Sequence, residues 1–305
     1  MEDNQPQTFS RSLVFLMFVG LYTTWSTTYL AIAYMVETIP PYLSAGLRFL
    51  AAGGILYAFA STRPKAPKTS LIHWRDAFIT GGLVIALGNG NVVVGEQYIP
   101  SSLAALLIST VPLWIIILNW LVFRAARPTF VEFAGVALGF AGVALLIGFT
   151  KSSAEEAFHP LGITIVLIAA ICWATGSLYS RYSHTPPSPL LAVSLQMLAG
   201  GVILVVLSFF TGEIFRFDPA QVSLESFLAW AYLVVFGSLV GFVCYMILLR
   251  TCRPSRVATY AYVTPVGAVF LGWLIAGDPV TVQTLVAAGI IIAAVFLIIS
   301  FAPKT

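Results

Sequence analysis

Two side-chain amides lie inside a long apolar stretch, in the string "ALGNGNVVVGEQ" at residues 86–97. Asn89 and Asn91 alternate there with Gly88 and Gly90, which weaken a helix and let neighbouring groups approach closely. Because amides both donate and accept hydrogen bonds, the string predicts a polar cavity wall, with the glycines as a deformable hinge. The alternative is hydrogen bonding between helices at a tight glycine contact. No strand precedes "GNG", so a phosphate-binding loop is excluded.

Two tryptophans stand in similar polar settings. Thr28 lies three residues after Trp25, and Ser177 lies four residues after Trp173. A tryptophan in the middle of an apolar stretch lies too deep for the aromatic belt of a membrane interface. An indole face beside hydroxyl groups fits a cavity for an amphipathic solute. Packing inside a helix bundle is the alternative.

Two prolines interrupt apolar stretches at corresponding places, Pro112 in the first half and Pro265 in the second. Proline removes a backbone hydrogen bond and bends a helix, so both are predicted to act as hinges. Carbonyls freed by such a bend can face a cavity. Polar side chains next to the prolines are therefore candidates for contact with a solute, and these are Thr110, Tyr260, Tyr262 and Thr264.

Arg48 is the one basic residue inside an apolar stretch. We expect it to form an outer-gate or structural ion pair with Glu96, which lies near the end of another stretch. Extending outward to the membrane surface and binding a carboxylate of the substrate are the alternatives. Glu96 is also the only carboxylate near the interior of a stretch, which argues against a buried proton relay.

Patterns for catalysis and metal binding are missing from the sequence. There is no HExxH motif, and His73, His159 and His184 fall in loops or at the ends of apolar stretches. The three cysteines form no CxxC pair, and no acidic cluster could hold sodium. No motif for ATP occurs. We therefore expect no enzyme activity, no metal and no cofactor.

The composition places the chain in a membrane. Of its 305 residues, 59% are hydrophobic and only 9% are charged, and the mean hydropathy is +0.95. Soluble domains carry roughly 25% charged residues. The net charge of +3 is too small, and its basic residues too scattered, to predict binding of nucleic acid. The lipid bilayer is the expected partner.

Continuous apolar runs of about 20 residues predict transmembrane helices, and ten such runs can be found. With the N-terminus inside, most of the fifteen Lys and Arg residues fall in cytoplasmic segments, and only Lys151 and Arg216 fall on the opposite side. The positive-inside rule then predicts that both termini are cytoplasmic. The ten predicted spans are 12–34, 42–61, 76–98, 101–123, 130–149, 160–181, 189–211, 225–249, 255–276 and 281–301.

The two halves of the chain resemble each other. Without a gap, Trp25, Leu30 and Pro41 align with Trp173, Leu178 and Pro189, and in a second block Ser102, Pro112 and Trp120 align with Ser255, Pro265 and Trp273. Each copy holds five spans, so the second must enter the membrane from the opposite side, as in transporters with inverted repeats. We expect tails at 1–11 and 302–305, and repeats at 12–150 and 151–301.

A stripe of small residues, Gly135, Gly139 and Gly142, marks a close-packing face on the fifth span. Packing within the chain and pairing with a second copy in a homodimer both fit this face.

The chain resembles the EamA-type transporters of the drug/metabolite transporter superfamily. The stretches that carry the resemblance are "WSTTYLAIAYMVETIPPYLSAGLRFLAAG", "GNGNVVVGEQYIPSSLAALLISTVPLWI", "CWATGSLYSR" and "TYAYVTPVGAVFLGWL". It covers nearly the whole chain, from about residue 12 to residue 301. The resemblance implies an all-α membrane carrier of ten helices, built from two inverted five-helix repeats.

The resemblance also implies a function. We expect a secondary transporter in the bacterial cytoplasmic (inner) membrane that exports or exchanges amino acids or similar small metabolites by alternating access. A multidrug carrier and a carrier of other metabolites, of the sugar or nucleotide type, are the alternatives. A non-transporting receptor or assembly protein would be expected to have long soluble segments, and none is evident.

Overall fold

The computed structural model describes residues 9–63, 68–99, 101–124, 127–147, 159–271, 274 and 282–301. Every regular element in these ranges is a helix, which confirms the predicted all-α class. Residues 81–90 and 233–242 form the wider π-helix.

The first half of the chain is a series of helices, three of which, α3, η1 and α4, follow one another without a break and form one continuous rod. Its elements are α1 (Arg11–Val36), α2 (Pro41–Ser61), α3 (Leu71–Thr80), η1 (Gly81–Gly90), α4 (Asn91–Gly95), α5 (Ser101–Ile108), α6 (Val111–Leu121) and α7 (Phe130–Ile147).

The second half contains a similar rod, in which α12, η3 and α13 are continuous. Its elements are α9 (Pro160–Tyr182), α10 (Pro189–Phe210), α11 (Glu213–Arg216), η2 (Pro219–Gln221), α12 (Leu224–Tyr232), η3 (Leu233–Phe242), α13 (Val243–Thr251), α14 (Pro254–Val257), α15 (Tyr260–Leu271) and α16 (Val282–Phe301).

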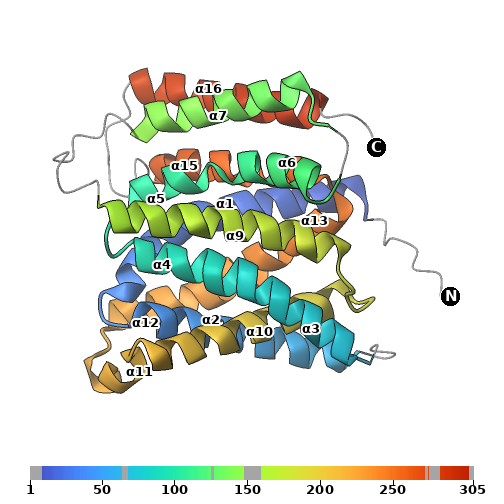
Figure 1. The fold of residues 1–305 in the computed structure, drawn as a ribbon. Helices are drawn as coiled ribbons and strands as arrows, with labels where there is room; N and C mark the ends of the chain where they lie inside the picture. Colours follow the sequence, from blue (N-terminus) through green and yellow to red (C-terminus); the bar gives the residue numbers. More distant parts are fainter. Residues whose placement is uncertain are drawn as a thin grey trace.

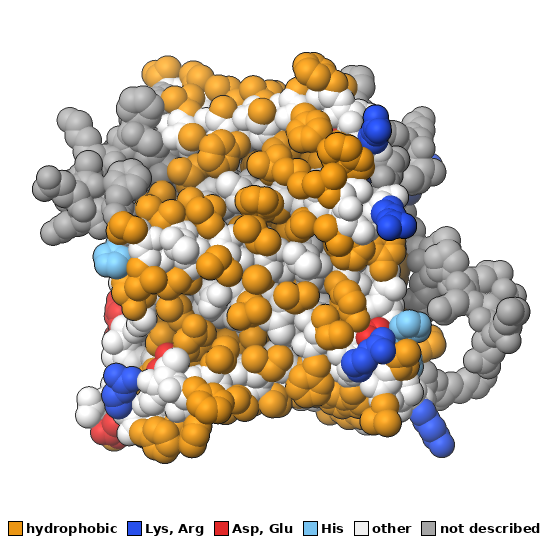
Figure 2. Space-filling model, viewed as in Figure 1, with side chains coloured by type: hydrophobic (Ala, Val, Ile, Leu, Met, Phe, Trp, Pro, Cys, Tyr) orange, Lys and Arg blue, Asp and Glu red, His pale blue; other side chains and the backbone are white. Residues whose placement is uncertain are grey.

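Seven helical segments of the described chain are long and apolar enough to cross a membrane. They correspond to the predicted spans 1–4 and 6–8. Shorter apolar helices cover Phe130–Leu145 and Leu285–Ile298, and part of the predicted ninth span lies outside the described residues. Figure 2 shows charged side chains near two opposite edges of the visible face, with hydrophobic side chains between them. The chain is therefore a helical membrane protein, and the count of ten spans stays a prediction.

Local sequence explains where several helices begin. Pro41 and Pro189 each open a helix, at the position where a missing backbone N–H costs nothing. The Glu213 carboxylate reaches across from α11 and accepts a hydrogen bond from the Leu43 backbone N–H at 3.0 Å. It thus caps the start of α2, and burial raises the pKa of this carboxyl group.

The two halves of the chain interlock rather than lie side by side. Helix α2 packs along α10, and α7 packs along α16. In the interior, α1 packs against η3 and α15, while α9 packs against η1 and α6. Figure 1 shows α7 and α16 as an outer layer, with α1 and α9 near the centre of the bundle. One face of α1, which includes Trp25, and most of α9 therefore lie between the halves, whereas the other face of α1 is exposed.

Glycines permit the closest of these contacts. A Cβ on Gly53 of α2 would lie 2.9 Å from Met197 Cβ of α10, and a Cβ on Gly201 of α10 would lie 2.9 Å from Leu50 Cγ of α2. On α7, Gly135 and Gly142 face Ile298 and Ile291 of α16 in the same way. The stripe of small residues on α7 is thus covered within the chain, and a homodimer stays a prediction.

Candidate functional site

The site is centred on a tryptophan pair, one from α1 and one from α9, and each ring packs against one of the two π-helical stretches. The indole rings of Trp25 on α1 and Trp173 on α9 are 5.5 Å apart and nearly perpendicular. Trp25 Nε1 donates to the carbonyl of Gly237 at 3.2 Å, and Trp173 Nε1 donates to the Tyr245 hydroxyl at 2.8 Å. Each indole is therefore fixed by a hydrogen bond to the rod of α12, η3 and α13.

Each of the two π-helices contributes a side chain to the site around the tryptophans. A π-helix closes its hydrogen bonds over five residues and often marks a functional site. Asn89 is near the end of η1, and Phe242 is the last residue of η3. Phe242 packs on the edge of Trp173, with ring centroids 6.5 Å apart. The wider turns thus bring one amide and one aromatic ring to the same place from opposite halves.

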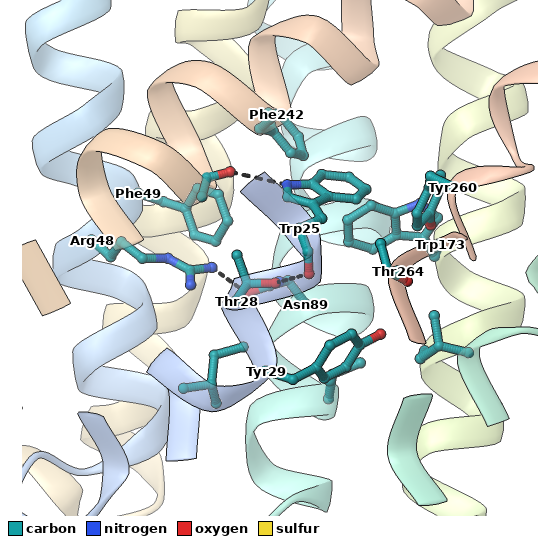
Figure 3. Close-up of a pocket in the computed structure, with 14 residues that line it drawn as sticks. Trp25, Thr28, Tyr29, Arg48, Phe49, Asn89, Trp173, Phe242, Tyr260 and Thr264 are labelled. Carbon is teal, nitrogen blue, oxygen red and sulfur yellow. Dashed lines mark hydrogen bonds between the residues drawn. The ribbon is translucent and has the colours of Figure 1, made fainter. Parts of the chain in front are cut away.

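A cavity of about 60 Å³, measured as the space open to the centres of water molecules, lies beside the tryptophan pair. One bound water needs roughly 10–15 Å³ on this measure, so a small solute or a few waters would fit. Figure 3 shows side chains from both halves converging on it. The lining residues are Trp25, Thr28, Tyr29, Ile32, Arg48, Phe49, Asn89, Val92, Ile108, Trp173, Gly237, Phe242, Tyr260 and Thr264.

A buried cation contributes to the wall of this cavity. Arg48 is only 3% exposed, and its Nη2 donates to the side-chain oxygen of Asn89. Its guanidinium carbon also lies 4.4 Å from the ring centroid of Phe49. Figure 3 shows the Arg48–Asn89 contact at the opposite side of the cavity from Trp173 and Tyr260. The cavity thus has one polar, positively charged wall and one aromatic wall.

Six of the side chains proposed from sequence as cavity candidates line this cavity. They come from α1, η1, α9 and α15, which are far apart in the chain. They are Trp25, Thr28, Asn89, Trp173, Tyr260 and Thr264.

Asn91 and Ser177 lie outside the cavity. Asn91 is two residues beyond Asn89, so it points to a different side of the helix and accepts a hydrogen bond from the Tyr42 hydroxyl of α2 at 3.4 Å. Ser177 is fully buried and its hydroxyl contacts that of Tyr245 at 2.6 Å. Both therefore connect helices rather than line the cavity.

Thr110 and Tyr262 also lie elsewhere. Thr110 borders a second cavity between α6 and α7, which is larger, at about 210 Å³. The hydroxyls of Ser109 and Thr110 in that lining already donate to backbone carbonyls of α5, each at 2.6 Å. The second cavity therefore offers little to a polar solute. Tyr262 is fully buried, and its ring packs on Gly139 of α7.

The two predicted hinge prolines occupy different settings. The helix is interrupted by a turn at residues 109–110, between α5 and α6, and Pro112 lies in the first turn of α6. Pro265 lies inside α15, which continues through it. The first proline thus coincides with a break in its helix, whereas the second does not.

The predicted glycine hinge is a tight packing point. A Cβ on Gly88 would lie 3.0 Å from Trp173 Cε3, and a Cβ on Gly90 would lie 2.6 Å from Leu204 Cδ2. Both glycines belong to η1. Their absent side chains therefore allow α9 and α10 to approach the π-helix.

Arg48 does not have the partner expected from sequence. Among the described residues, Asp76 forms an ion pair with Arg75 and contacts the His184 imidazole, whereas no ion pair joins Arg48 to Glu96. The contact between Arg48 and Asn89 could not be predicted from charge, because a buried cation is expected to pair with a carboxylate. Phe242 was missed too, although it aligns with Asn89 in the same register that aligns Pro112 with Pro265.

Hydrogen bonds within and between the halves close one end of the bundle. The Asp76 carboxylate of α3 is 1% exposed. It accepts from the Tyr179 hydroxyl of α9 at 3.0 Å and from the His184 backbone N–H at 2.7 Å. Arg181 Nη1 donates to the Leu249 carbonyl at 2.7 Å. These bonds tie α3, α9 and α13 together at the end of the bundle where α3 begins.

Comparison with known proteins gives consistent matches. The sequence profile of the EamA-like transporter family matches residues 12–148 and 160–300. The chain is 39% identical over 281 residues to a protein of Escherichia coli (strain K12) named "Uncharacterized inner membrane transporter YedA", covering 92% of this chain and 88% of that one. It is 25% identical over 296 residues to a Bacillus subtilis (strain 168) protein named "Uncharacterized transporter YvbV", covering 96% and 92%.

A solved crystal structure shares the fold. It superposes with a TM-score of 0.74 at 20% identity and covers 95% of this chain and 98% of the other. At this identity the match speaks for the fold alone.

Proposed function

The chain belongs to the EamA-like transporter family of the drug/metabolite transporter superfamily, and from this premise we propose that it carries small metabolites by alternating access. The proposed substrates are amino acids and similar small metabolites, which the protein exports or exchanges. The proposed location is the bacterial cytoplasmic membrane, in keeping with the name of the Escherichia coli relative.

The observation that carries the proposal is the cavity at the tryptophan pair. Trp25 and Trp173 are aligned residues of the two halves, and each half also contributes a π-helix to the lining. Substrate sites of transporters with internal repeats lie at the repeat interface near the middle of the membrane. An aromatic cavity with a few polar groups at such an interface fits a small amphipathic solute.

Two inverted repeats, each of five spans, are part of the proposal. The family model matches the chain twice, in its first and second halves. The packing of α2 on α10 and of α7 on α16 pairs corresponding segments of the two halves. Helix α1 begins and α16 ends at the same edge of the bundle (Figure 1), which supports placing both termini on one side of the membrane. The positive-inside rule makes that side the cytoplasm.

The cavity's position supports a state closed toward the cytoplasm. Its lining runs from the tryptophan pair toward the end of α1 and the start of α2, where Ile32 and Arg48 lie. On the other side of the pair, Ser177 and Tyr245 are fully buried and joined to each other. Release of this contact and of the Asp76 contacts would open the opposite side during transport.

Flux into liposomes tests the proposal. Purified protein in liposomes is loaded with one solute and assayed for countertransport of labelled amino acids, sugars, nucleosides and cationic drugs. We expect saturable flux of amino acids, reduced at least about tenfold by Trp173→Ala, a loss of about 1.4 kcal/mol or more. Trp120→Ala, which alters a partly exposed tryptophan of α6, is the matched control. Flux of every solute equal to that of empty liposomes would overturn the proposal.

A further inference from the structure

Arg48 is a charged group whose hydrogen-bonding capacity is only partly used. A guanidinium carries five N–H donors. Nη2 donates to Asn89, whereas the buried Nε has no hydrogen-bond partner. The guanidinium group also packs over the ring of Phe49. Arg48 therefore keeps donors available on a side chain that lines the cavity.

Burial of this cation costs free energy that its present contacts offset only in part. Removing a charge from water costs several kcal/mol in real proteins unless a countercharge and hydrogen bonds replace the lost hydration. Asn89 supplies one neutral amide oxygen. A buried charge that lacks a countercharge in a membrane helix is a candidate for ligand binding.

The other groups around the cavity do not supply that countercharge. The lining residues that the structure describes include hydroxyls, an amide and aromatic rings, but no carboxylate. Glu96 lies seven residues beyond Asn89 on the same rod, and the described ion pairs do not join it to Arg48. The positive charge at the cavity wall is therefore open to an anion that enters the cavity.

The shape of the site selects among anions. A guanidinium matches the two oxygens of a carboxylate in a bidentate contact. A phosphate dianion would bring two charges to a lining that offers one cation. Across the cavity, Trp25, Trp173 and Tyr260 present aromatic surface suited to an apolar group.

We propose that Arg48 binds the carboxylate of the transported solute, while Asn89 holds the guanidinium in place and the aromatic wall takes an apolar side chain. The substrate class is thus small monocarboxylates with an apolar body, including amino acids, rather than cationic drugs, sugars or nucleosides. The inference rests on the proposed function for transport, but the binding it predicts can be measured without flux.

Thermal unfolding of the purified full chain tests the binding. The probes are acetate, 4-methylpentanoate, 3-phenylpropionate and leucine, each compared with its amide, and inorganic phosphate. We expect the apolar carboxylates and leucine to raise Tm with concentration, and their amides and phosphate to have no such effect. Arg48→Gln should weaken the apparent affinity about 10- to 100-fold, as expected for lost charge-assisted hydrogen bonds. Arg216→Gln, in the short helix α11, is the control.

Asn89→Asp gives a second test if Arg48→Gln fails to fold. An aspartate at this position would supply the missing countercharge from within the chain. We expect Tm without ligand to hold or rise, and the response to carboxylates to disappear. A purely structural role of Asn89 would not produce this combination. Equal responses to acids and amides, persistence of the acid response in Arg48→Gln or Asn89→Asp, or no response to any carboxylate would overturn the inference.

The two proposals can fail separately. Flux of solutes that lack a carboxylate, unchanged in Arg48→Gln, would overturn the inference and leave the transport function standing. Binding of carboxylates without flux of any solute would overturn the transport function and leave the inference on binding standing.

Discussion

Gly88 of η1 lies directly against the indole of Trp173: a Cβ on Gly88 would be 3.0 Å from Cε3 and 3.5 Å from Cβ of the tryptophan. Gly241 of η3 lies against Trp25, with Trp25 Nε1 as its nearest neighbour. The two π-helices therefore hold the two tryptophans by the same kind of contact. The spacing of the tryptophan pair depends on the absence of side chains at these glycines.

Gly88→Ala is predicted to displace Trp173 and to impair transport. The added methyl group must push the ring aside, and overpacking of this kind costs about 1–3 kcal/mol. We expect a lower Tm and a flux reduced several-fold in proteoliposomes. Gly54→Ala is the control, because a Cβ there would meet no atom within 4 Å. Equal effects of the two substitutions would contradict the contact.

Asn89→Ala and Asn91→Ala are predicted to differ. Asn89 lines the cavity and contacts Arg48, whereas Asn91 accepts one hydrogen bond from Tyr42. We expect Asn89→Ala to lower countertransport about tenfold or more, and Asn91→Ala to lower Tm slightly, with flux within about threefold of wild type. The factors differ because Asn89→Ala removes a hydrogen bond to a charged group, whereas Asn91→Ala removes a hydrogen bond between neutral groups. The reverse order of effects on flux would place Asn91 at the solute.

Trp173 and Tyr245 are predicted to be energetically coupled. The indole N–H donates to the Tyr245 hydroxyl at 2.8 Å, and the same hydroxyl contacts Ser177 at 2.6 Å. A double-mutant cycle of Trp173→Phe and Tyr245→Phe should therefore give a coupling energy of about 1 kcal/mol. Chemical unfolding of the four proteins measures it. Additive effects of the two substitutions would show that the bond contributes nothing.

Asp76→Asn is predicted to loosen the closed end of the bundle. The substitution removes the charge from bonds with Tyr179 and with the backbone of His184, and each bond to a charged group contributes about 1.5–3 kcal/mol. We expect Ser180→Cys, at a residue only 4% exposed, to react with an impermeant maleimide several times faster in the Asp76→Asn background. Glu225→Gln, on α12, is the control. An unchanged rate would exclude a role of Asp76 in closing this end.

The membrane class and seven of the spans could be predicted from the sequence, because a bilayer demands long apolar runs whatever the packing. Trp25, Trp173 and Asn89 could also be found, since aromatic and amide groups deep in such runs are unusual. Asn91 was expected in the cavity because it shares the GNGN string with Asn89, and Tyr262 because it lies close to Pro265. Each lies two residues from a residue that does line the cavity. On a helix that spacing turns a side chain away.

Other features depend on contacts that a single sequence does not reveal. The π-helices form where Gly88 and Gly241 pack on tryptophans from the other half of the chain. The partner of Arg48 is an amide 41 residues away in the chain, whereas its charge alone suggested Glu96. Phe242 has no polar group to mark it, and only its alignment with Asn89 indicates a role.

The central claim is that the transported solute binds at the tryptophan pair, and protection of an introduced cysteine tests it most directly. Cys172, Cys244 and Cys252 are first replaced by serine, and Thr28→Cys or Thr110→Cys is then added. Both threonines are half-buried, but Thr28 lines the central cavity and Thr110 lines the second one. We expect the transported solute to slow thiol labelling at residue 28 in proportion to its occupancy and to leave residue 110 unaffected. Protection at residue 110 alone, or at neither position under saturating solute, would contradict the account.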